Sequence, residues 1–300
     1  MQNAKLRALR FFEKLIYDRV ADRATDIRNV ITALDIPYAA DDLNWHKLDV
    51  YAPTAHPRNL PAVINLHGGG WCIADKKHFR YFCRTIAAGG YVVFNINYRL
   101  APDYPHPAQL ADVLSAMAWV KLHASEYGAD PEKVFLLGDS AGAHLAALAA
   151  CVCTNRNLEG FYRIKAPYSE KEIRGCILFC GVYDLRSSLK TSFPLIKDFV
   201  RALLGTRDIE QYPNLERVAP VKNITSQFPP CLVSDSLKDA LIGESRNLIR
   251  MLDQNGVKHR DLLFEDVGKA SPHDYQIESD KPIFDRCIQA CLAFLDEHRG

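Results

Sequence analysis

Residues 134–142 read Val134-Phe135-Leu136-Leu137-Gly138-Asp139-Ser140-Ala141-Gly142, an apolar run followed by a Gly-x-Ser-x-Gly pentapeptide. The apolar run predicts a buried strand, and the segment Ala141–Ala150, rich in Ala and Leu, predicts a helix. Such a pentapeptide between a strand and a helix is typical of a nucleophile elbow, a tight turn that exposes a strained serine. We therefore expect Ser140 to be a nucleophile. The alternative is an ordinary strand-to-helix connection in which Ser140 caps the helix.

A second motif, His67-Gly68-Gly69-Gly70-Trp71, follows another strand-like run at 62–66. Three consecutive glycines let the backbone approach a ligand closely and point its N–H groups inward. A serine nucleophile needs such donors for the oxyanion that forms when it attacks a carbonyl. We expect Gly68, Gly69 and Gly70 to form this oxyanion hole together with the N–H group of Ala141.

A nucleophilic serine also needs a histidine, which should lie in a loop after the last strand. Residues 262–267 predict that strand, and His273 follows it. His259 lies at the start of the strand and His298 in the C-terminal helix, so we expect His273 to be the general base. The alternative is a loop histidine that titrates freely.

Two aspartates are candidates for the acid of the triad. Both follow the strand Cys231–Ser234, which Pro229-Pro230 precedes. Asp235 lies nearer the strand end, and Asp239 lies just before a helix predicted over 243–252. The one that is not the acid should fix the loop through hydrogen bonds to backbone N–H groups.

Together these motifs, with Asn97-Tyr98-Arg99-Leu100-Ala101-Pro102 between them, resemble the hormone-sensitive-lipase-like branch of the α/β-hydrolases, which includes many bacterial carboxylesterases. The resemblance covers most of 60–150 and resumes at 228–275. It implies Asp239 as the acid, because Asp239-Ala240-Leu241 has the family's spacing from Pro229-Pro230 and from Asn255-Gly256-Val257. The resemblance also implies hydrolysis of short acyl or small aryl esters.

The chain departs from the family pattern at several positions. Ala143 replaces a frequent glycine and is followed by His144, Ala240 replaces proline, and Asp274 replaces the usual glycine after the histidine. The segment 142–145 also resembles arylformamidases, which keeps an amide or formamide hydrolase as an alternative. A further alternative is a ligand-binding receptor, because this fold serves that role after losing its histidine.

Length and composition are those of one enzyme domain spanning 1–300. The net charge is +1 and charged residues make up 24%, which argues against a nucleic-acid partner. No apolar stretch approaches the ~20 residues of a membrane span, so we expect a soluble, cytoplasmic protein without stable membrane insertion. An exposed cap or edge strand would allow a homodimer.

The nine cysteines form pairs within apolar runs, such as Cys151 and Cys153. This pattern indicates free thiols used as small core residues in a reducing compartment. No Cys-x-x-Cys pair or His/Cys cluster has zinc spacing, so we expect neither a metal nor another cofactor.

Strand-like and helical stretches alternate along the chain, which predicts an α/β fold with a mostly parallel sheet covered by helices on both faces. The clearest helices span 108–123 and 141–153. The expected strands span 47–51, 62–66, 91–97, 133–137, 175–180, 231–234 and 259–264.

Two segments outside this alternation predict a helical cap. Residues 1–40 begin with apolar side chains at helical spacing, Leu6, Leu9, Phe12, Ile16 and Val20, for which a membrane-surface helix is the alternative. Residues 185–218 should supply the rest of the cap and the acyl pocket, or else form a peripheral helix. We expect the substrate pocket to involve Trp71, Asp139, Phe193 and Phe199, although Trp71 would equally suit packing under the cap.

Overall fold

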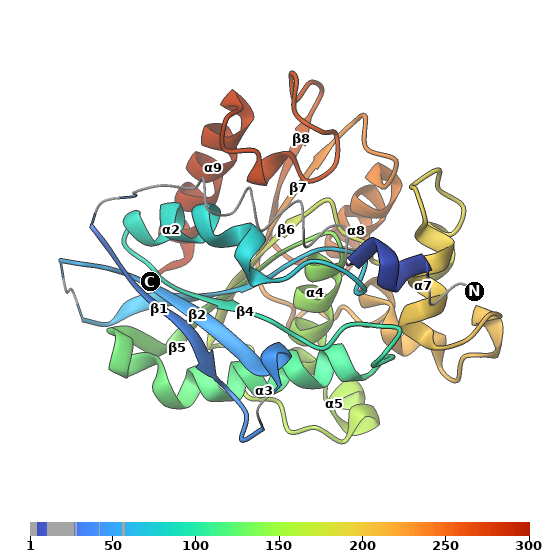
Figure 1. Ribbon diagram of the computed structural model, residues 1–300, viewed down its shortest axis with the longest axis horizontal. Coiled ribbons are helices and arrows are strands. Elements are labelled where there is room, and N and C mark those ends of the chain that lie inside the picture. The colour runs from blue at the N-terminus through green and yellow to red at the C-terminus, as the bar shows by residue number, and fades with distance from the viewer. Residues whose placement is uncertain (1–4, 11–26, 28, 42, 56–57) are drawn as a thin grey trace.

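The protein is described by a computed structural model covering residues 5–10, 27, 29–41, 43–55 and 58–300 (Figure 1). An eight-stranded sheet with the order β1-β2-β4-β3-β5-β6-β7-β8 runs through it. β2 is antiparallel to both β1 and β4, and the remaining neighbours are parallel. The strands are β1 Val30–Pro37, β2 Lys47–Pro53, β3 Leu60–Leu66, β4 Val92–Ile96, β5 Ala129–Asp139, β6 Ile173–Phe179, β7 Cys231–Ser236 and β8 His259–Phe264.

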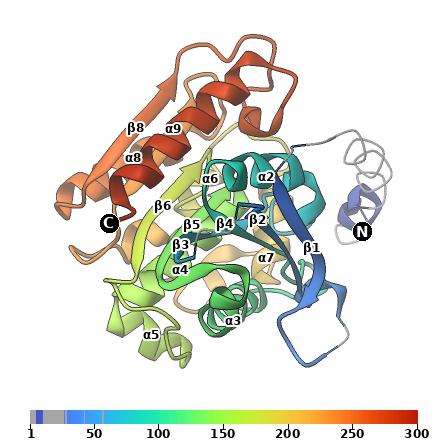
Figure 2. The same cartoon turned by 90° about the vertical axis from the view of Figure 1, so that its left-hand side faces the viewer.

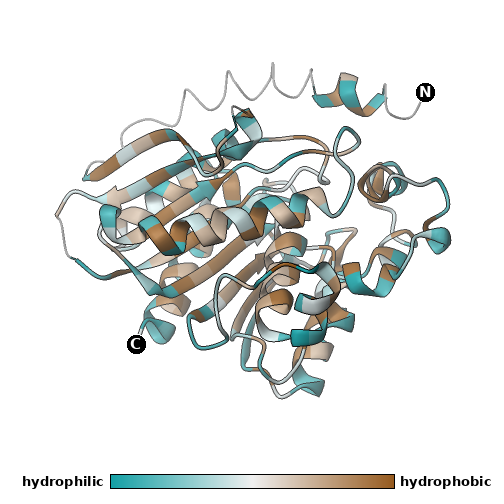
Figure 3. Ribbon diagram, turned by 90° about the horizontal axis from the view of Figure 1, so that it is seen from below, coloured by the Kyte–Doolittle hydropathy of each residue, from teal (hydrophilic) through white to brown (hydrophobic). Residues whose placement is uncertain are grey.

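Helices cover both faces of the sheet, as predicted (Figures 1 and 2). The buried side chains of α2 and α9 join one apolar cluster, and those of α3, α4 and α8 join another on the opposite face. These helices span α2 Arg80–Ala88, α3 Ala108–His123, α4 Ala141–Thr154, α8 Ile242–Gln254 and α9 Pro282–His298. Figure 3 shows the most hydrophobic ribbon in the central strands and in the helix faces packed on them.

The central strands are mostly apolar because both of their faces are covered. Every residue of β3 and β4 is buried. The carboxyl ends of β3, β5, β6 and β7 lie at the same edge of the sheet, since these strands are parallel and adjacent. The loops that follow them therefore meet at this edge, which is where ligands bind in sheets of this kind.

The first strand was not predicted. Residues 30–37, expected to belong to the cap, instead form the edge strand β1. Most of its side chains are at least partly exposed, and it is held by backbone pairing with β2. A strand without a buried face carries little of the hydrophobic signal that sequence patterns detect.

The other expected cap segments flank the same edge. Residues 5–10 are helical and lie beside α7 (Ile196–Leu204), where Lys5 pairs with Asp198 (Figure 1). Phe12, Ile16 and Val20, also expected in this helix, lie outside the described residues. The segment 185–218 contains α6 Leu185–Ser188, α7, η4 Ile209–Gln211 and η5 Leu215–Val218. The remaining short elements are α5 Arg156–Tyr162, η1 Asn44–His46, η2 Lys76–Phe79, η3 Ala124–Tyr127, η6 Pro220–Lys222 and η7 Tyr275–Ile277.

All nine cysteines are buried and free, which confirms their predicted use as core residues. Within the described ranges, no helix has both the length and the apolar character needed to cross a bilayer.

Candidate active site

Ser140 lies in the sharp turn between β5 and α4. Its backbone has φ 49° and ψ −118°, a combination that non-glycine residues rarely adopt. The turn is tight because α4 starts immediately above the end of β3, and a Cβ on Gly142 would clash with the carbonyl oxygen of Leu66. This strand–turn–helix geometry is the one predicted for a nucleophile elbow.

His273 and Asp239 meet Ser140 at the carboxyl edge of the sheet. The Oγ atom of Ser140 lies 3.0 Å from Nε2 of His273, and Nδ1 of His273 lies 2.7 Å from Oδ2 of Asp239. Asp239 is buried, and its second oxygen accepts the backbone N–H of Leu241 at 2.8 Å. The three side chains form a continuous hydrogen-bonded chain in the order Asp, His, Ser.

Asp235, the other candidate acid, has hydrogen-bond partners other than the histidine. Its carboxylate accepts the hydroxyl of Ser245 at 2.6 Å and the backbone N–H of Ser236 at 2.7 Å. Burial and the neighbouring charge of Asp239 raise the pKa of Asp235 to about 7. Asp235 therefore fixes the loop after β7, which is the role expected for the aspartate that is not the acid.

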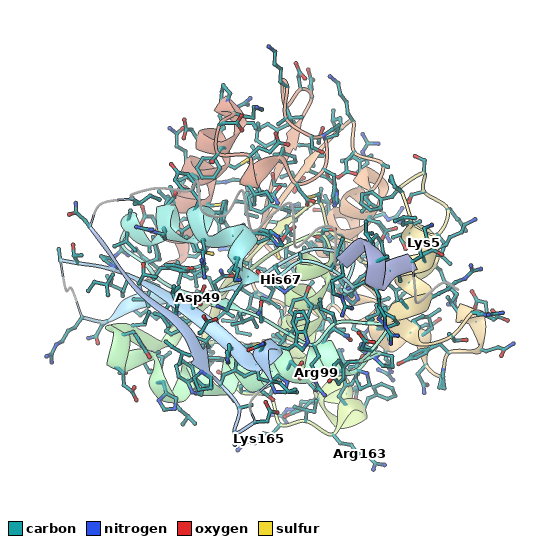
Figure 4. The ribbon with its side chains drawn as sticks, viewed as in Figure 1. Lys5, Asp49, His67, Arg99, Arg163 and Lys165 are labelled. Carbon is teal, nitrogen blue, oxygen red and sulfur yellow. The ribbon has the colours of Figure 1, made fainter. Side chains whose placement is uncertain are left out.

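The glycine turn after β3 is anchored through its first residue, His67, which lies near the centre of the molecule in Figure 4. The hydroxyl of Tyr98 donates to the carbonyl of His67 at 2.6 Å, and the two rings stack with their centroids 4.3 Å apart. Among the described residues, the N–H groups of Gly69, Gly70 and Ala141 donate no hydrogen bond. They are therefore open to a ligand beside Ser140.

Two phenylalanines from the segment 185–218 lie against these groups. The ring of Phe193 packs edge-on against His273, with centroids 4.6 Å apart. Phe199, on α7, lies so close to Gly70 that a Cβ at Gly70 would be 2.6 Å from its Cγ atom. Both side chains thus lie against groups of the candidate active site, and the substrate pocket expected there stays a prediction.

Trp71 is the last residue of the glycine turn and is buried. Its side chain is 1% exposed, and its indole N–H donates to Nδ1 of His144 at 3.2 Å. The other ring nitrogen of His144 donates to the carbonyl of Val218 at 2.8 Å. Burial lowers the pKa of His144 to about 4, so the ring is neutral at pH 7. Trp71 thus joins the glycine turn to α4 and to η5, which fits the alternative that it packs under the cap.

Asp139 and Asp274 form a pair of carboxyl groups beside His273. Asp139 is 2% exposed and lies against Gly68. Burial and the nearby Asp274 raise the pKa of Asp139 well above its usual range. Asp139 was expected in the substrate pocket, and here it supports the carboxylate next to the histidine.

Sequence reasoning noted Asp274 only as a departure from a family glycine. Its backbone has φ 63°, the left-handed region that favours glycine, so the substitution kept the turn and added a carboxylate. Its Oδ1 atom lies 3.4 Å from Nε2 of His273. Burial lowers the pKa of His273, but the charge of Asp274 and the hydrogen bond to Asp239 outweigh burial and raise that pKa to about 9.

The basic residues of the segment 5–10 reach the same region from the other side. Arg10 donates to the carbonyl of Cys72 at 2.7 Å and to the carbonyl of Ala101 at 2.6 Å. Arg7 and Arg10 both pair with Asp103. These contacts hold the helical segment 5–10 against the loop that follows the glycine turn.

The chain matches the family model BD-FAE over residues 48–251. Among curated proteins, it is 30% identical over 220 residues to esterase LipQ of Mycobacterium tuberculosis, covering 71% of this chain and 50% of LipQ. It is 39% identical over 111 residues to carboxylesterase NlhH of the same species, covering 37% of this chain and 35% of NlhH. The chain thus spans about half the length, or less, of these relatives.

Solved structures share the fold over nearly the whole chain. An inhibited esterase B from Lactobacillus rhamnosis superposes with a TM-score of 0.85 at 23% identity, covering 99% of this chain and 96% of that one. A hyperthermophilic esterase from Pyrobaculum calidifontis has a TM-score of 0.77 at 22% identity, covering 98% and 94%. The predicted α/β-hydrolase fold is therefore confirmed.

Proposed function

Because the chain belongs to the BD-FAE family and to the hormone-sensitive-lipase-like branch of the α/β-hydrolases, we propose that it is a serine carboxylesterase for short acyl or small aryl esters. The observation that carries the proposal is the chain of contacts from Asp239 to His273 to Ser140, at 2.7 and 3.0 Å. These distances allow proton transfer between hydroxyl and imidazole without rearrangement.

In the proposed reaction, Ser140 Oγ attacks the ester carbonyl while Nε2 of His273 takes the hydroxyl proton. Asp239 holds Nδ1 and stabilises the imidazolium that forms. The imidazolium then gives the proton to the departing alcohol, leaving an acyl group on Ser140. Water, deprotonated by the same nitrogen, attacks the acyl-enzyme and releases the acid.

The negative oxygen of each tetrahedral intermediate needs donors that are in place before the reaction starts. We assign this role to the N–H groups of Gly69, Gly70 and Ala141, with Gly68 shaping the turn. The assignment is supported by the absence of another acceptor for these three groups among the described residues. Loss of one such donor raises the barrier by roughly 3 kcal/mol in comparable sites.

The preference for short acyl chains rests on the two phenylalanines. Phe193 lies against His273 and Phe199 against Gly70, so the two rings flank the groups that would hold the acyl carbonyl. A pocket closed by two aromatic rings suits a small apolar group better than a long chain, which would have to displace them.

The proposal is tested with initial rates on p-nitrophenyl esters from acetate to palmitate, for the wild type and Ser140→Ala in parallel. We expect the rate to be highest for short chains and to vanish in the variant, which should unfold at the same temperature as the wild type. Full activity in a pure Ser140→Ala preparation would disprove the mechanism.

A matched anilide and an N-formyl arylamine in the same assay distinguish an amide or formamide hydrolase. His144 belongs to the segment 142–145 on which that alternative rests. Its contacts do not support the alternative, because one ring nitrogen accepts from Trp71 and the other donates to Val218. Labelling of Ser140 by a fluorophosphonate would exclude a receptor without catalysis.

The homodimer stays a prediction, which size-exclusion chromatography with light scattering tests.

A further inference from the structure

Three potential metal ligands from distant parts of the chain converge beside Ser140. They are Cys180, directly after β6, and His273 with Asp274, in the loop between β8 and η7. One donor atom from each lies within 4.8 Å of the other two. Among the described residues, no other group of three His, Cys, Asp or Glu side chains meets this criterion.

The spacing of these atoms is close to that of a tetrahedral zinc site. Zinc bonds of about 2.0 Å to N and O and 2.3 Å to S place neighbouring ligands roughly 3.3–3.5 Å apart. Here Asp274 Oδ1 lies 3.4 Å from His273 Nε2 and 3.8 Å from Cys180 Sγ. Two of the three donor pairs are thus close to this spacing, and the third pair, Cys180 Sγ and His273 Nε2, lies within 4.8 Å.

The surroundings suit a cation that arrives from solvent. The Asp274 side chain is 40% exposed and that of His273 is 15% exposed, whereas Cys180 is fully buried beneath them. Behind Asp274 lies the buried carboxyl of Asp139, which interacts with the Asp274 side chain as outer-shell partners do with metal ligands. A thiolate and a carboxylate together would neutralise a divalent ion.

We propose that Cys180, His273 and Asp274 form a reversible inhibitory site for Zn²⁺. The ion replaces the proton of the Cys180 thiol and the proton on Nε2 of His273, both of which are released to solvent, and bonds to Sγ, Nε2 and Oδ1. The fourth position is left to water or to Ser140 Oγ. Bound zinc occupies the nitrogen that Ser140 needs, so its inhibitory effect rests on the proposed esterase function, whereas its binding does not.

Binding is tested without activity, on metal-free Ser140→Ala protein titrated with Co²⁺ under a phosphine reductant. We expect a thiolate-to-cobalt charge-transfer band that saturates at one ion per chain and disappears when Zn²⁺ is added. Cys180→Ala in the same background should lose the band. Cys291→Ala, which removes another buried free thiol in α9, should keep it.

Asp274→Gly is the second variant, in case Cys180→Ala does not fold. It should weaken Co²⁺ binding at least about tenfold, because even outer-shell changes cost roughly 10–100-fold in metal affinity. The absence of a thiolate band in folded Ser140→Ala protein, or a band unchanged in Cys180→Ala, would overturn the proposal.

Inhibition is then measured on the active protein, with each rate divided by that variant's own metal-free rate. Stoichiometric Zn²⁺ should suppress ester hydrolysis, and a chelator should restore it. Zinc should inhibit Cys291→Ala as it does the wild type, and Cys180→Ala much more weakly. Equal inhibition of Cys180→Ala would contradict the site. If no ester is hydrolysed at all, the esterase proposal fails and the cobalt band still decides the metal site.

Discussion

The Oδ1 atom of Asp274 lies 3.4 Å from Nε2 of His273, the nitrogen that also faces the hydroxyl of Ser140 at 3.0 Å. Because Asp239 holds the other ring nitrogen at 2.7 Å, the imidazole has a carboxyl oxygen near each of its nitrogens. Asp274 therefore stabilises the protonated ring in the free enzyme. The Asp274 carboxylate is also a second acceptor for the proton on Nε2, in competition with the oxygen atoms of Ser140 and of the leaving alcohol.

This arrangement predicts an alkaline pH profile. His273 accepts the serine proton only when neutral, and its pKa is raised to about 9, so kcat/KM should increase with pH until the medium passes that value. Asp274→Asn removes a nearby negative charge, which lowers this pKa and should move the acidic limb down by roughly one pH unit.

The profile is measured from pH 5 to 10 on a short p-nitrophenyl ester. Asp280→Asn, an exposed aspartate paired with Lys281, is the matched control and should leave the limb in place. An unshifted limb in Asp274→Asn would mean that Asp274 does not control the charge of His273.

The two aspartates after β7 should respond differently to the same substitution. Asp239→Asn keeps the size of the side chain but removes the charge that favours the productive tautomer of His273, so kcat should fall by about 10⁴. Asp235→Asn should change kcat less than about tenfold, because Asp235 bonds only Ser245 and Ser236 among the described residues.

Both variants are compared by kcat and by thermal unfolding. Asp235→Asn should lose some stability, about 1–2 kcal/mol, since the amide cannot accept both hydrogen bonds as the carboxylate does. A larger kcat loss in Asp235→Asn than in Asp239→Asn would reverse the assignment of the acid.

Glycine-to-alanine changes at two positions test the geometry of the elbow. Gly142→Ala puts a methyl group into the carbonyl of Leu66 and should destabilise the protein by several kcal/mol or prevent folding. Gly243→Ala, in α8, meets no atom within 4 Å and should stabilise it by about 0.5–1 kcal/mol. Chemical denaturation of both variants measures the difference, and equal unfolding midpoints would show that the elbow is less tightly packed.

The preferred acyl-chain length should change when the ring of Phe199 on α7 is removed. Phe199→Ala opens the space in front of Gly70, so the ester with the highest kcat/KM should become longer by several carbons. Phe161→Ala, at a phenylalanine with 41% exposure in α5, is the control and should leave the optimum unchanged. An unchanged optimum in Phe199→Ala would place the acyl pocket elsewhere.

Several features of the molecule could be predicted from the sequence. The strand, serine and helix at 134–150, and the glycine turn at 67–71, depend on local backbone geometry that only a few residue types allow. The helix expected over 108–123 matches α3, because the apolar residues within this segment are enough to predict a helix. The position of His273 after the last predicted strand was enough to select it as the candidate general base.

Other features depend on which segments are adjacent in space. β1 is held by pairing with β2, so its own side chains carry little pattern. Asp239 and Asp235 differ by four positions; the family's spacing favoured Asp239, and the path of the loop brings its carboxylate to the histidine. The packing of Trp71 on His144 joins residues separated by 73 positions.

The sequence by itself thus determined the elbow, the glycine turn and the parallel sheet, because each needs only a short run of suitable residues. The tertiary structure alone decided what surrounds His273. Cys180 and Asp274 are 94 positions apart, and they meet because β6 and β8 flank β7 in the sheet and end at the same edge. The spacing of these residues along the sequence does not predict that they lie together, because the order of the strands in the sheet brings them together.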